Sequence, residues 1–223
     1  HDALPIYPSF GQEDGTYRFC IDSRRLNMVT RFDSEPMPNP DDILAKLAKD
    51  KYFSKLDLSK GYWQIPVAEE SQHMTAFTTP QWCFHFKMML FGLVNSAATF
   101  NRMMRKVLGG VHDTDSFVDD VLNHTVTWST HMETLRNTFE RIRKAGLTIR
   151  PSKTMLGYTN LGFIGHTVGA GEVAMESDKL TKIKDAPRPK TKQQVRSFLG
   201  LAGYYRKFIP NFATIAVPLT DQI

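Results

Sequence analysis

The chain has 223 residues, of which 41% are hydrophobic and 23% charged, so it has the composition of an ordinary folded protein of one or two domains. Its net charge of +5 is compatible with a polyanionic partner but does not require one. Cys20 and Cys83 are the only cysteines, which excludes a disulfide framework or a zinc-ligand spacing and favours a reducing compartment. No apolar run approaches the roughly 20 residues of a membrane helix.

Basic residues gather toward the C-terminal end. Between Asp178 and Lys207 the sequence has nine Lys or Arg against two Asp. This stretch is the candidate surface for a phosphate backbone, and a solvated helical face is an equally good interpretation. The start, His1-Asp2-Ala3, is neither an initiator Met nor a signal peptide, so we expect a piece of a longer product.

The first half of the chain predicts one helix followed by strands. A cap at Asn39, with Pro40 in the first turn, predicts a helix that runs to about Lys49. A strand is expected from Tyr52 to Leu58. Further strands are expected where apolar runs alternate with turn residues. They are Trp63–Val67, Met74–Thr79 and Cys83–Met88.

The second half predicts two helices around a hairpin, then a second hairpin and more helices. A helix is expected from Asn95 or Ser96 to Gly109, followed by a hairpin over 116–122. The next helix is expected over 130–145, with a Thr130/Glu133 capping box and a buried stripe of Met132, Leu135, Phe139 and Ile142. A hairpin of Leu161–Thr167 with Glu172–Met175 then precedes helices over 177–184 and 191–208. This order indicates an α+β fold with a β-α-β-β-α-like centre between residues 52 and 145. A separate helical lobe begins near Pro187.

Two acidic sites interrupt the apolar strands and are the candidates for chemistry. Asp57 ends a predicted strand, and Asp119-Asp120 lie in a predicted hairpin turn. Carboxylates in apolar surroundings repel each other and lose solvation, so a cation that neutralises them favours their persistence. Carboxylate oxygens suit Mg²⁺ or Mn²⁺, and two such ions roughly 3.5–4 Å apart support phosphoryl transfer. Taken alone, an Asp-Asp pair in a turn is more often only a solvated turn.

Seven stretches, in order and at matching spacing, resemble the reverse transcriptases of gypsy-type LTR retrotransposons. They are 17–27 (YRFCIDSRRLN), 53–65 (FSKLDLSKGYWQI), 75–79 (TAFTT), 91–100 (FGLVNSAATF), 117–120 (FVDD), 161–166 (LGFIGH) and 196–210 (RSFLGLAGYYRKFIP). The resemblance covers roughly residues 14 to 220. It implies a right-hand polymerase fold with fingers and an antiparallel-sheet palm over 1–186, of which 1–13 are atypical, and a helical thumb or connection segment over 187–223.

The same resemblance implies a catalytic centre and a cofactor. Asp57, Asp119 and Asp120 would be the catalytic acids. Together with the backbone carbonyl of Leu58 they would ligate two Mg²⁺ or Mn²⁺ ions per active site. The implied reaction adds dNTPs to a primer 3′ end on an RNA or DNA template.

The implied nucleotide site comprises Arg18, Tyr62, Phe91 and Gly92. The guanidinium of Arg18 would contact the triphosphate, and the ring of Tyr62 would exclude a ribose 2′-hydroxyl. Phe91 and Gly92 would shape the nucleotide and template pocket. For Tyr62 the alternative is a core aromatic beside Trp63.

The implied primer grip comprises Phe163, Ile164, Gly165 and His166, which would hold the primer 3′ hydroxyl in line with the α-phosphate. The alternatives are a β-turn glycine at Gly165 and a surface strand residue at His166. The implied partners are an RNA/DNA template-primer, dNTPs, and the RNase H, integrase and protease segments of a parent polyprotein, with no membrane. The implied location is a cytoplasmic virus-like particle or the nucleus.

The sequence also departs from the family pattern. Gln12-Glu13 stand where lysines are usual, Phe117 replaces a tyrosine, Leu90 and Ala97 replace prolines, and Ser23 replaces an aromatic residue. The leading hypothesis is an active RNA-directed DNA polymerase. The second is a catalytically impaired remnant that only binds nucleic acid, and a third, remote one is a two-metal nuclease.

Overall fold

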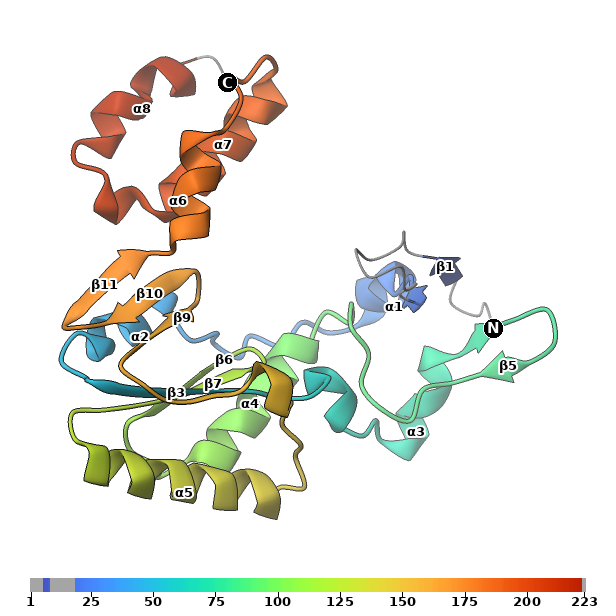
Figure 1. The fold of residues 1–223 in the computed structure, drawn as a ribbon. Coiled ribbons are helices and arrows are strands. Elements are labelled where there is room, and N and C mark those ends of the chain that lie inside the picture. Colours follow the sequence, from blue (N-terminus) through green and yellow to red (C-terminus); the bar gives the residue numbers. More distant parts are fainter. Residues whose placement is uncertain (1–5, 9–18, 222–223) are drawn as a thin grey trace.

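A four-stranded antiparallel sheet forms the centre of the molecule, in the order β6-β7-β3-β8. A computed structural model describes residues 6–8 and 19–221 of the chain. The strands of the central sheet are β3 (Tyr52–Asp57), β6 (Thr114–Phe117), β7 (Asp120–Thr125) and β8 (Met155–Tyr158). Helices α4 (Ser96–Leu108) and α5 (Trp128–Lys144) cover one face (Figure 1). The predicted β-α-β-β-α centre is therefore confirmed.

Alternation along β3 and β7 divides the apolar residues between two cores. Leu56 and Val121 face α4 and α5, where they pack in one cluster with Phe100 and Met104. Phe53 and Leu122 face the other side and join a second cluster. Since side chains alternate along a strand, Asp57 and Asp120 lie on the face that Phe53 and Leu122 share.

Helix α2 and a small three-stranded sheet cover part of that second face. The helix, α2 (Pro40–Leu47), begins as predicted at Asn39, whose side chain accepts a hydrogen bond from the Asp41 amide at 3.0 Å. The small sheet has the order β11-β10-β9. Its strands are β9 (Asn160–Phe163), β10 (His166–Gly169) and β11 (Glu172–Met175).

The fingers side of the molecule is built from short elements. They are β1 (Ile6–Pro8), β2 (Phe19–Ile21), α1 (Arg24–Val29), η1 (Gly61–Gln64), α3 (Glu69–Gln72), η2 (His73–Thr75), β4 (Phe77–Thr78) and β5 (Cys83–Phe84). The predicted strand over 63–67 is wrong: Trp63 lies in a 3₁₀ turn that begins after Lys60, a residue with φ of 55°. The strands predicted over 74–79 and 83–88 are shorter in the structure, where only the two-residue strands β4 and β5 form.

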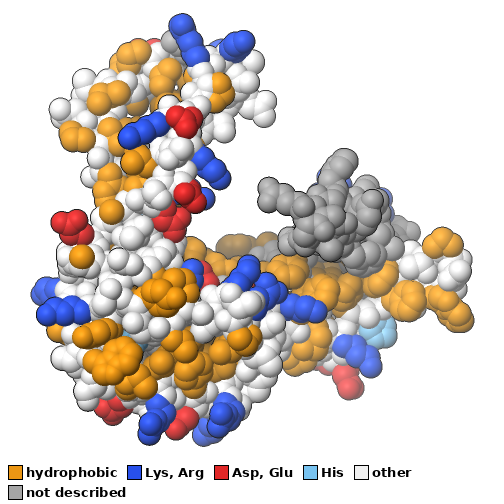
Figure 2. Space-filling model, viewed as in Figure 1, with side chains coloured by type: hydrophobic (Ala, Val, Ile, Leu, Met, Phe, Trp, Pro, Cys, Tyr) orange, Lys and Arg blue, Asp and Glu red, His pale blue; other side chains and the backbone are white. Residues whose placement is uncertain are grey.

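A C-terminal lobe of helices stands apart from the sheet (Figure 1). We use "C-terminal lobe" for α6 (Ser177–Lys184), α7 (Lys192–Tyr204), η4 (Arg206–Phe208) and α8 (Phe212–Thr220). The predicted helix over 191–208 ends earlier, at Tyr204, and α8 is additional. Figure 2 shows an open hollow between this lobe and the opposite arm of the molecule. The boundary between residues 186 and 187 stays a prediction.

Three other details of the predicted elements are wrong. Helix α5 is capped by Thr127, not Thr130, since Thr127 accepts the hydrogen bond from the Thr130 amide. Met132 is 44% exposed, and the buried face of α5 instead includes His131 and Thr138. The strand predicted over 161–167 is two strands, β9 and β10, joined by a turn. Within the described residues, no helix is long and apolar enough to cross a membrane.

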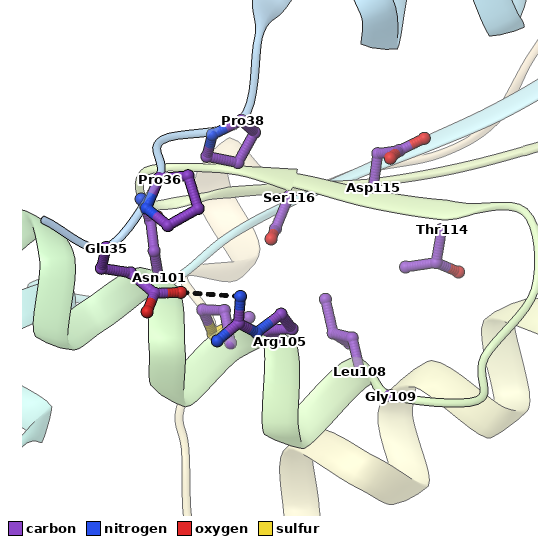
Figure 3. Close-up of a pocket in the computed structure, with 11 residues that line it drawn as sticks. Glu35, Pro36, Pro38, Asn101, Arg105, Leu108, Gly109, Thr114, Asp115 and Ser116 are labelled. Carbon is purple, nitrogen blue, oxygen red and sulfur yellow. Dashed lines mark ion pairs between the residues drawn. The ribbon is translucent and has the colours of Figure 1, made fainter.

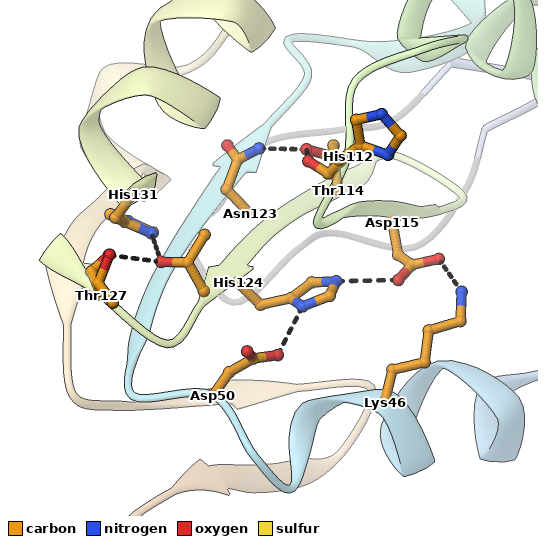
Figure 4. Close-up of polar contacts among 10 residues, drawn as sticks. Lys46, Asp50, His112, Thr114, Asp115, Asn123, His124, Thr127 and His131 are labelled. Atoms are coloured by element: carbon orange, nitrogen blue, oxygen red, sulfur yellow. Dashed lines mark hydrogen bonds and ion pairs between the residues drawn. The ribbon is translucent and has the colours of Figure 1, made fainter. Parts of the chain in front are cut away.

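A polar network links the β6–β7 hairpin to α2 (Figure 4). His124 on β7 contacts Asp50 at 2.7 Å through Nδ1 and Asp115 on β6 at 3.0 Å through Nε2. Lys46 of α2 pairs with the other oxygen of Asp115 at 2.7 Å. Burial opposes protonation of His124, but the hydrogen bonds to Asp115 and Asp50 outweigh it and raise the pKa of the imidazole. The network therefore ties α2 to both strands of the hairpin.

Candidate active site

The backbone brings the three predicted acids to one end of the central sheet. Asp57 and Asp120 are direct partners across β3 and β7. Directly opposed residues of an antiparallel pair have Cβ atoms about 4.5–5.5 Å apart on one face. Asp119 lies in the two-residue turn before β7, and its carbonyl accepts a hydrogen bond from the Leu58 amide at 2.9 Å. Asp120 itself begins the strand.

The electrostatics of the acids are those of a site that attracts cations. Burial, followed by the negative charges of Asp57 and Asp120, raises the pKa of Asp119. Burial also raises the pKa of Asp120, with Asp57 adding to the rise and Lys55 opposing it. Oδ1 of Asp119 is buried and has no hydrogen-bond partner within the described part of the chain.

The three acids suit a divalent ion by the chemistry of their oxygen atoms rather than by their spacing. An orphaned buried carboxylate oxygen beside two further carboxylates is a donor set of hard oxygens, which Mg²⁺ and Mn²⁺ prefer. Among residues 6–8 and 19–221, however, no three His, Cys, Asp or Glu side chains are grouped closely enough to form a ready metal site. The acids thus share one end of the sheet, but their side chains are not grouped into a closed ligand set.

Tyr62 and Phe91 stand beside the acids. Burial, and then the charge of Asp119, raises the pKa of the Tyr62 phenol, which places the ring near that carboxylate. The ring centroid of Tyr62 lies 5.3 Å from that of Phe91 and 5.4 Å from that of Phe100. Phe91 is 51% exposed, so one side of this aromatic group is open to a ligand.

Asn27 holds the turn that contains Gly92. Its amide nitrogen donates to the Gly92 carbonyl at 2.7 Å, and its amide oxygen accepts from the Val94 amide at 2.9 Å. Gly92 has φ of 89°, a conformation that favours glycine. Both hydrogen bonds connect α1 to the start of α4, so the Phe91-Gly92 turn is fixed by a side chain more than 60 residues earlier. Arg18, the remaining predicted nucleotide ligand, lies outside the described residues.

The four predicted primer-grip residues lie at the β9–β10 turn, two of them buried. The side chain of Phe163 is 1% exposed and belongs to the core, so this residue presents only backbone outward. His166 is also 1% exposed, which rules out the surface strand residue considered from the sequence. Ile164 and Gly165 form the two-residue turn.

Lys55 and Gly61 belong to the site although the sequence analysis gave them no role. Lys55 lies two residues before Asp57, so it shares the same face of β3. Its ammonium donates to the Gly162 carbonyl of β9 at 3.1 Å. A Cβ on Gly61 would overlap Oδ1 of Asp119. Period-two alternation could have revealed Lys55, whereas nothing in the sequence signals the approach of Asp119 to Gly61.

Two cavities of the described structure lie away from the acids. One of about 260 Å³ lies between α4, β6 and the 35–38 segment, where Glu35 pairs with Arg105 at 2.8 Å (Figure 3). Another, of about 370 Å³, is lined by apolar and polar residues of α1, the 65–75 segment and the start of α4. Neither is lined by a predicted site residue. The candidate site at the end of the sheet is therefore separate from both cavities.

Residues 11–168 match the family model of reverse transcriptase (RNA-dependent DNA polymerase). The chain belongs to the reverse transcriptase family. Its sequence is 38% identical over 207 residues to the retrovirus-related Pol polyprotein from transposon 297 of Drosophila melanogaster, a match that covers 92% of this chain and 20% of that protein. It is 35% identical to the corresponding polyprotein from transposon gypsy, over 92% of this chain and 20% of the relative. The gypsy-type resemblance is confirmed, and the chain spans about a fifth of these relatives.

Solved structures confirm the polymerase fold. The foamy viral protease-reverse transcriptase in complex with double-stranded DNA superimposes with a TM-score of 0.92 at 30% identity, covering 98% of this chain and 38% of the other. The same viral protein in complex with an RNA/DNA hybrid gives a TM-score of 0.87 at 30% identity, over 98% of this chain and 30% of the other. The predicted fingers, palm and helical lobe therefore belong to a right-hand polymerase.

Proposed function

We propose that this chain is the polymerase core of a retrotransposon reverse transcriptase, which adds dNTPs to a primer 3′ end on an RNA or DNA template. The observation that carries the proposal is the pairing of Asp57 with Asp120 beside the buried Oδ1 of Asp119, which has no partner among the described residues. Charges this close cost free energy unless a cation compensates them.

Asp57, Asp119, Asp120 and the carbonyl of Leu58 would hold the two Mg²⁺ or Mn²⁺ ions. Such ions lower the pKa of an attacking hydroxyl and stabilise a leaving phosphate oxygen. The remaining residues position reactants, which is most of what phosphoryl transfer asks of a protein. Tyr62, packed between Phe91 and Phe100, is rigid enough to exclude a ribose 2′-hydroxyl by collision.

Nucleic acid would lie in the hollow between the C-terminal lobe and the opposite arm (Figure 2). Basic side chains of the stretch from Asp178 to Lys207 are largely exposed on that lobe and would meet phosphates of the duplex. The dNTPs would enter beside Phe91, where the aromatic group is open. RNase H and integrase segments would belong to the parent polyprotein, in a virus-like particle or the nucleus.

Primer extension tests the proposal directly. The purified chain should extend an oligo(dT) primer on poly(rA) with Mg²⁺ or Mn²⁺, and Asp119→Asn should reduce the rate by roughly a thousandfold or more, because it removes a metal ligand and its charge. Asp113→Asn is the matched control, since Asp113 is exposed directly before β6 and, among the described residues, bonds only through its backbone.

Each result separates the rival functions. Extension that survives Asp119→Asn would contradict the metal role. Tight template-primer binding by the unaltered chain with no extension at high dNTP would favour the impaired remnant. Cleavage of a labelled template in the absence of dNTPs would favour the nuclease.

A further inference from the structure

The turn between β9 and β10 has a backbone that its own sequence disfavours. Ile164 has φ of 48° and Gly165 has φ of 70°. A two-residue hairpin turn with both residues at positive φ is usual for Asn-Gly, but a β-branched residue in the left-handed region is strained. Such a conformation persists only where surrounding contacts enforce it.

Two consecutive tyrosines of the C-terminal lobe supply those contacts. The hydroxyl of Tyr204 donates to the Ile164 carbonyl at 3.1 Å, and the hydroxyl of Tyr205 donates to the Gly165 carbonyl at 3.1 Å. We call these two side chains the tyrosine latch. Each carbonyl of the turn is thus bound by its own phenol from the end of α7.

The rings of the latch also enclose His166. Its ring centroid lies 5.6 Å from that of Tyr204, 5.4 Å from that of Tyr205 and 5.6 Å from that of Phe208. Nδ1 of His166 lies 2.7 Å from the Ile164 carbonyl, so that oxygen meets both the imidazole and a phenol. Burial lowers the pKa of His166, which favours the neutral ring that packs among aromatic neighbours.

A side chain at position 165 would crowd the latch. A Cβ there would lie 2.8 Å from the Tyr205 hydroxyl oxygen, closer than real contacts allow. The neighbouring Lys207 pairs with Asp41 at the start of α2, at 2.8 Å. The end of α7 and the following η4 therefore attach to the palm at the turn and at α2.

We propose that Tyr204 and Tyr205 are positioning residues for polymerisation, which hold the Ile164-Gly165 turn in the conformation that places the primer 3′ end. The inference rests on the proposed function, in which residues 163–166 hold the primer. It goes further by making the position of that turn depend on the C-terminal lobe. A displacement of the lobe would withdraw both phenols at once and release the strained turn.

Phenylalanine substitutions test the latch with little change in packing, because they remove only the hydroxyl groups. We expect Tyr204→Phe and Tyr205→Phe each to lower kcat about three- to tenfold at saturating dNTP and primer. The double variant should lose about tenfold to a hundredfold. The Kd for template-primer should change less than twofold in all three. Tyr158→Phe is the matched control, since Tyr158 is 46% exposed, as Tyr204 is, and lies on β8.

Two further measurements do not depend on turnover. Amide hydrogen exchange at residues 164–166 should be at least fivefold faster in the double variant, with exchange in α5 unchanged. A 2-aminopurine base at the primer 3′ terminus, bound without dNTP, should change fluorescence in the double variant and not in Tyr158→Phe.

The outcomes are distinct. Unchanged exchange at 164–166 would overturn the latch itself. Faster exchange with unchanged kcat and unchanged 2-aminopurine fluorescence would overturn its coupling to the primer. If the unaltered chain does not extend primers, the proposed function fails, and exchange together with 2-aminopurine fluorescence still decides for or against the latch.

Discussion

The two hairpin turns of the palm resemble each other in backbone and differ in what holds them. Val118, in the turn before Asp120, has φ of 52°, and Ile164, in the turn before His166, has φ of 48°. Both are β-branched residues at a position where glycine or asparagine is usual. The first turn is held by main-chain bonds within the sheet, including that from Leu58 to Asp119. The second has one main-chain bond of this kind, from the Glu176 amide to the Gly165 carbonyl at 3.4 Å, and is otherwise held by the phenols of another lobe.

The turn that carries the catalytic acids and the turn that would position the primer therefore depend on different parts of the molecule. Main-chain bonds inside the sheet fix the position of the acids, so that position depends little on the C-terminal lobe. Side-chain hydroxyls from the C-terminal lobe let the second turn respond to where that lobe stands. Strain at each turn is consistent with function, since strained residues cluster at functional sites.

Of the substitutions that crowd a turn, the larger effect should come from the first turn. In Gly61→Ala the new Cβ would overlap Oδ1 of Asp119, so the carboxylate must move. A displacement of about 1 Å at a reacting centre can cost about a hundredfold. We expect kcat for primer extension to fall by roughly that factor while template-primer binding persists. Full activity would show that Asp119 tolerates displacement and would weaken the claim that its turn is rigid.

Crowding the second turn should cost less. Gly165→Ala introduces both a residue at φ of 70° and a contact with Tyr205, and we expect kcat to fall by about tenfold. Gly146→Ala is the matched control, since Gly146 has φ of 69° and open space, within the described atoms, around its Cβ position. Both variants should lose about 1–2 kcal/mol of stability from backbone strain. A similar drop in kcat for both would mean that strain alone accounts for the loss.

The negative charge of Asp119 should lower the stability of the folded chain. Because the pKa of Asp119 is raised in the folded chain, its charged form opposes folding at any pH above that raised value. Without divalent ions, Asp119→Asn should therefore raise Tm at pH 7.5 by roughly 2–4 °C, and the difference should vanish below the ordinary carboxyl pKa. Scanning calorimetry with and without Mn²⁺ measures this, and Mn²⁺ should stabilise only the unaltered chain.

An effect of similar size should come from the polar network around His124. The raised pKa of His124 means that its contribution to stability is complete below about pH 6.5 and is lost as the pH rises through the raised value. Between pH 6 and pH 9 the unaltered chain should lose roughly 2–4 °C of Tm relative to His124→Asn. Parallel curves for the two proteins would show that the imidazole does not change its charge in this range.

The sequence predicted what local patterns and family motifs encode. Strands β3, β6 and β7, helices α2 and α4 and the acids at the sheet end followed from alternation, caps and motif order, whereas strand β8 was not predicted. The strand prediction ran through the β9–β10 turn, although a β-turn glycine at Gly165 was one alternative. Ile164 is not a turn residue, and the contacts that impose its conformation come from 40 residues further along the chain. The 3₁₀ turn at Trp63 was read as a strand for a similar reason, since Lys60 at φ of 55° gives no turn signal.

The roles of single residues were harder to predict than their proximity. Asp57 and Asp120 meet because antiparallel pairing of two predicted strands brings them together. The placement of Asn27 against Gly92, and of Tyr205 against Gly165, depends on contacts between distant segments that no local pattern records.

One ammonium group serves two parts of the palm. Lys55 donates to the Gly162 carbonyl while its charge offsets the cost of ionising Asp120. The small sheet and the acidic cluster therefore share one ammonium group that is built into the chain, and Lys153 is a second cation that favours ionised Asp120. Acylation of the Lys55 amine would remove this charge. Asp120 would then be harder to ionise and β9 would lose a hydrogen bond, and added salt could not restore both.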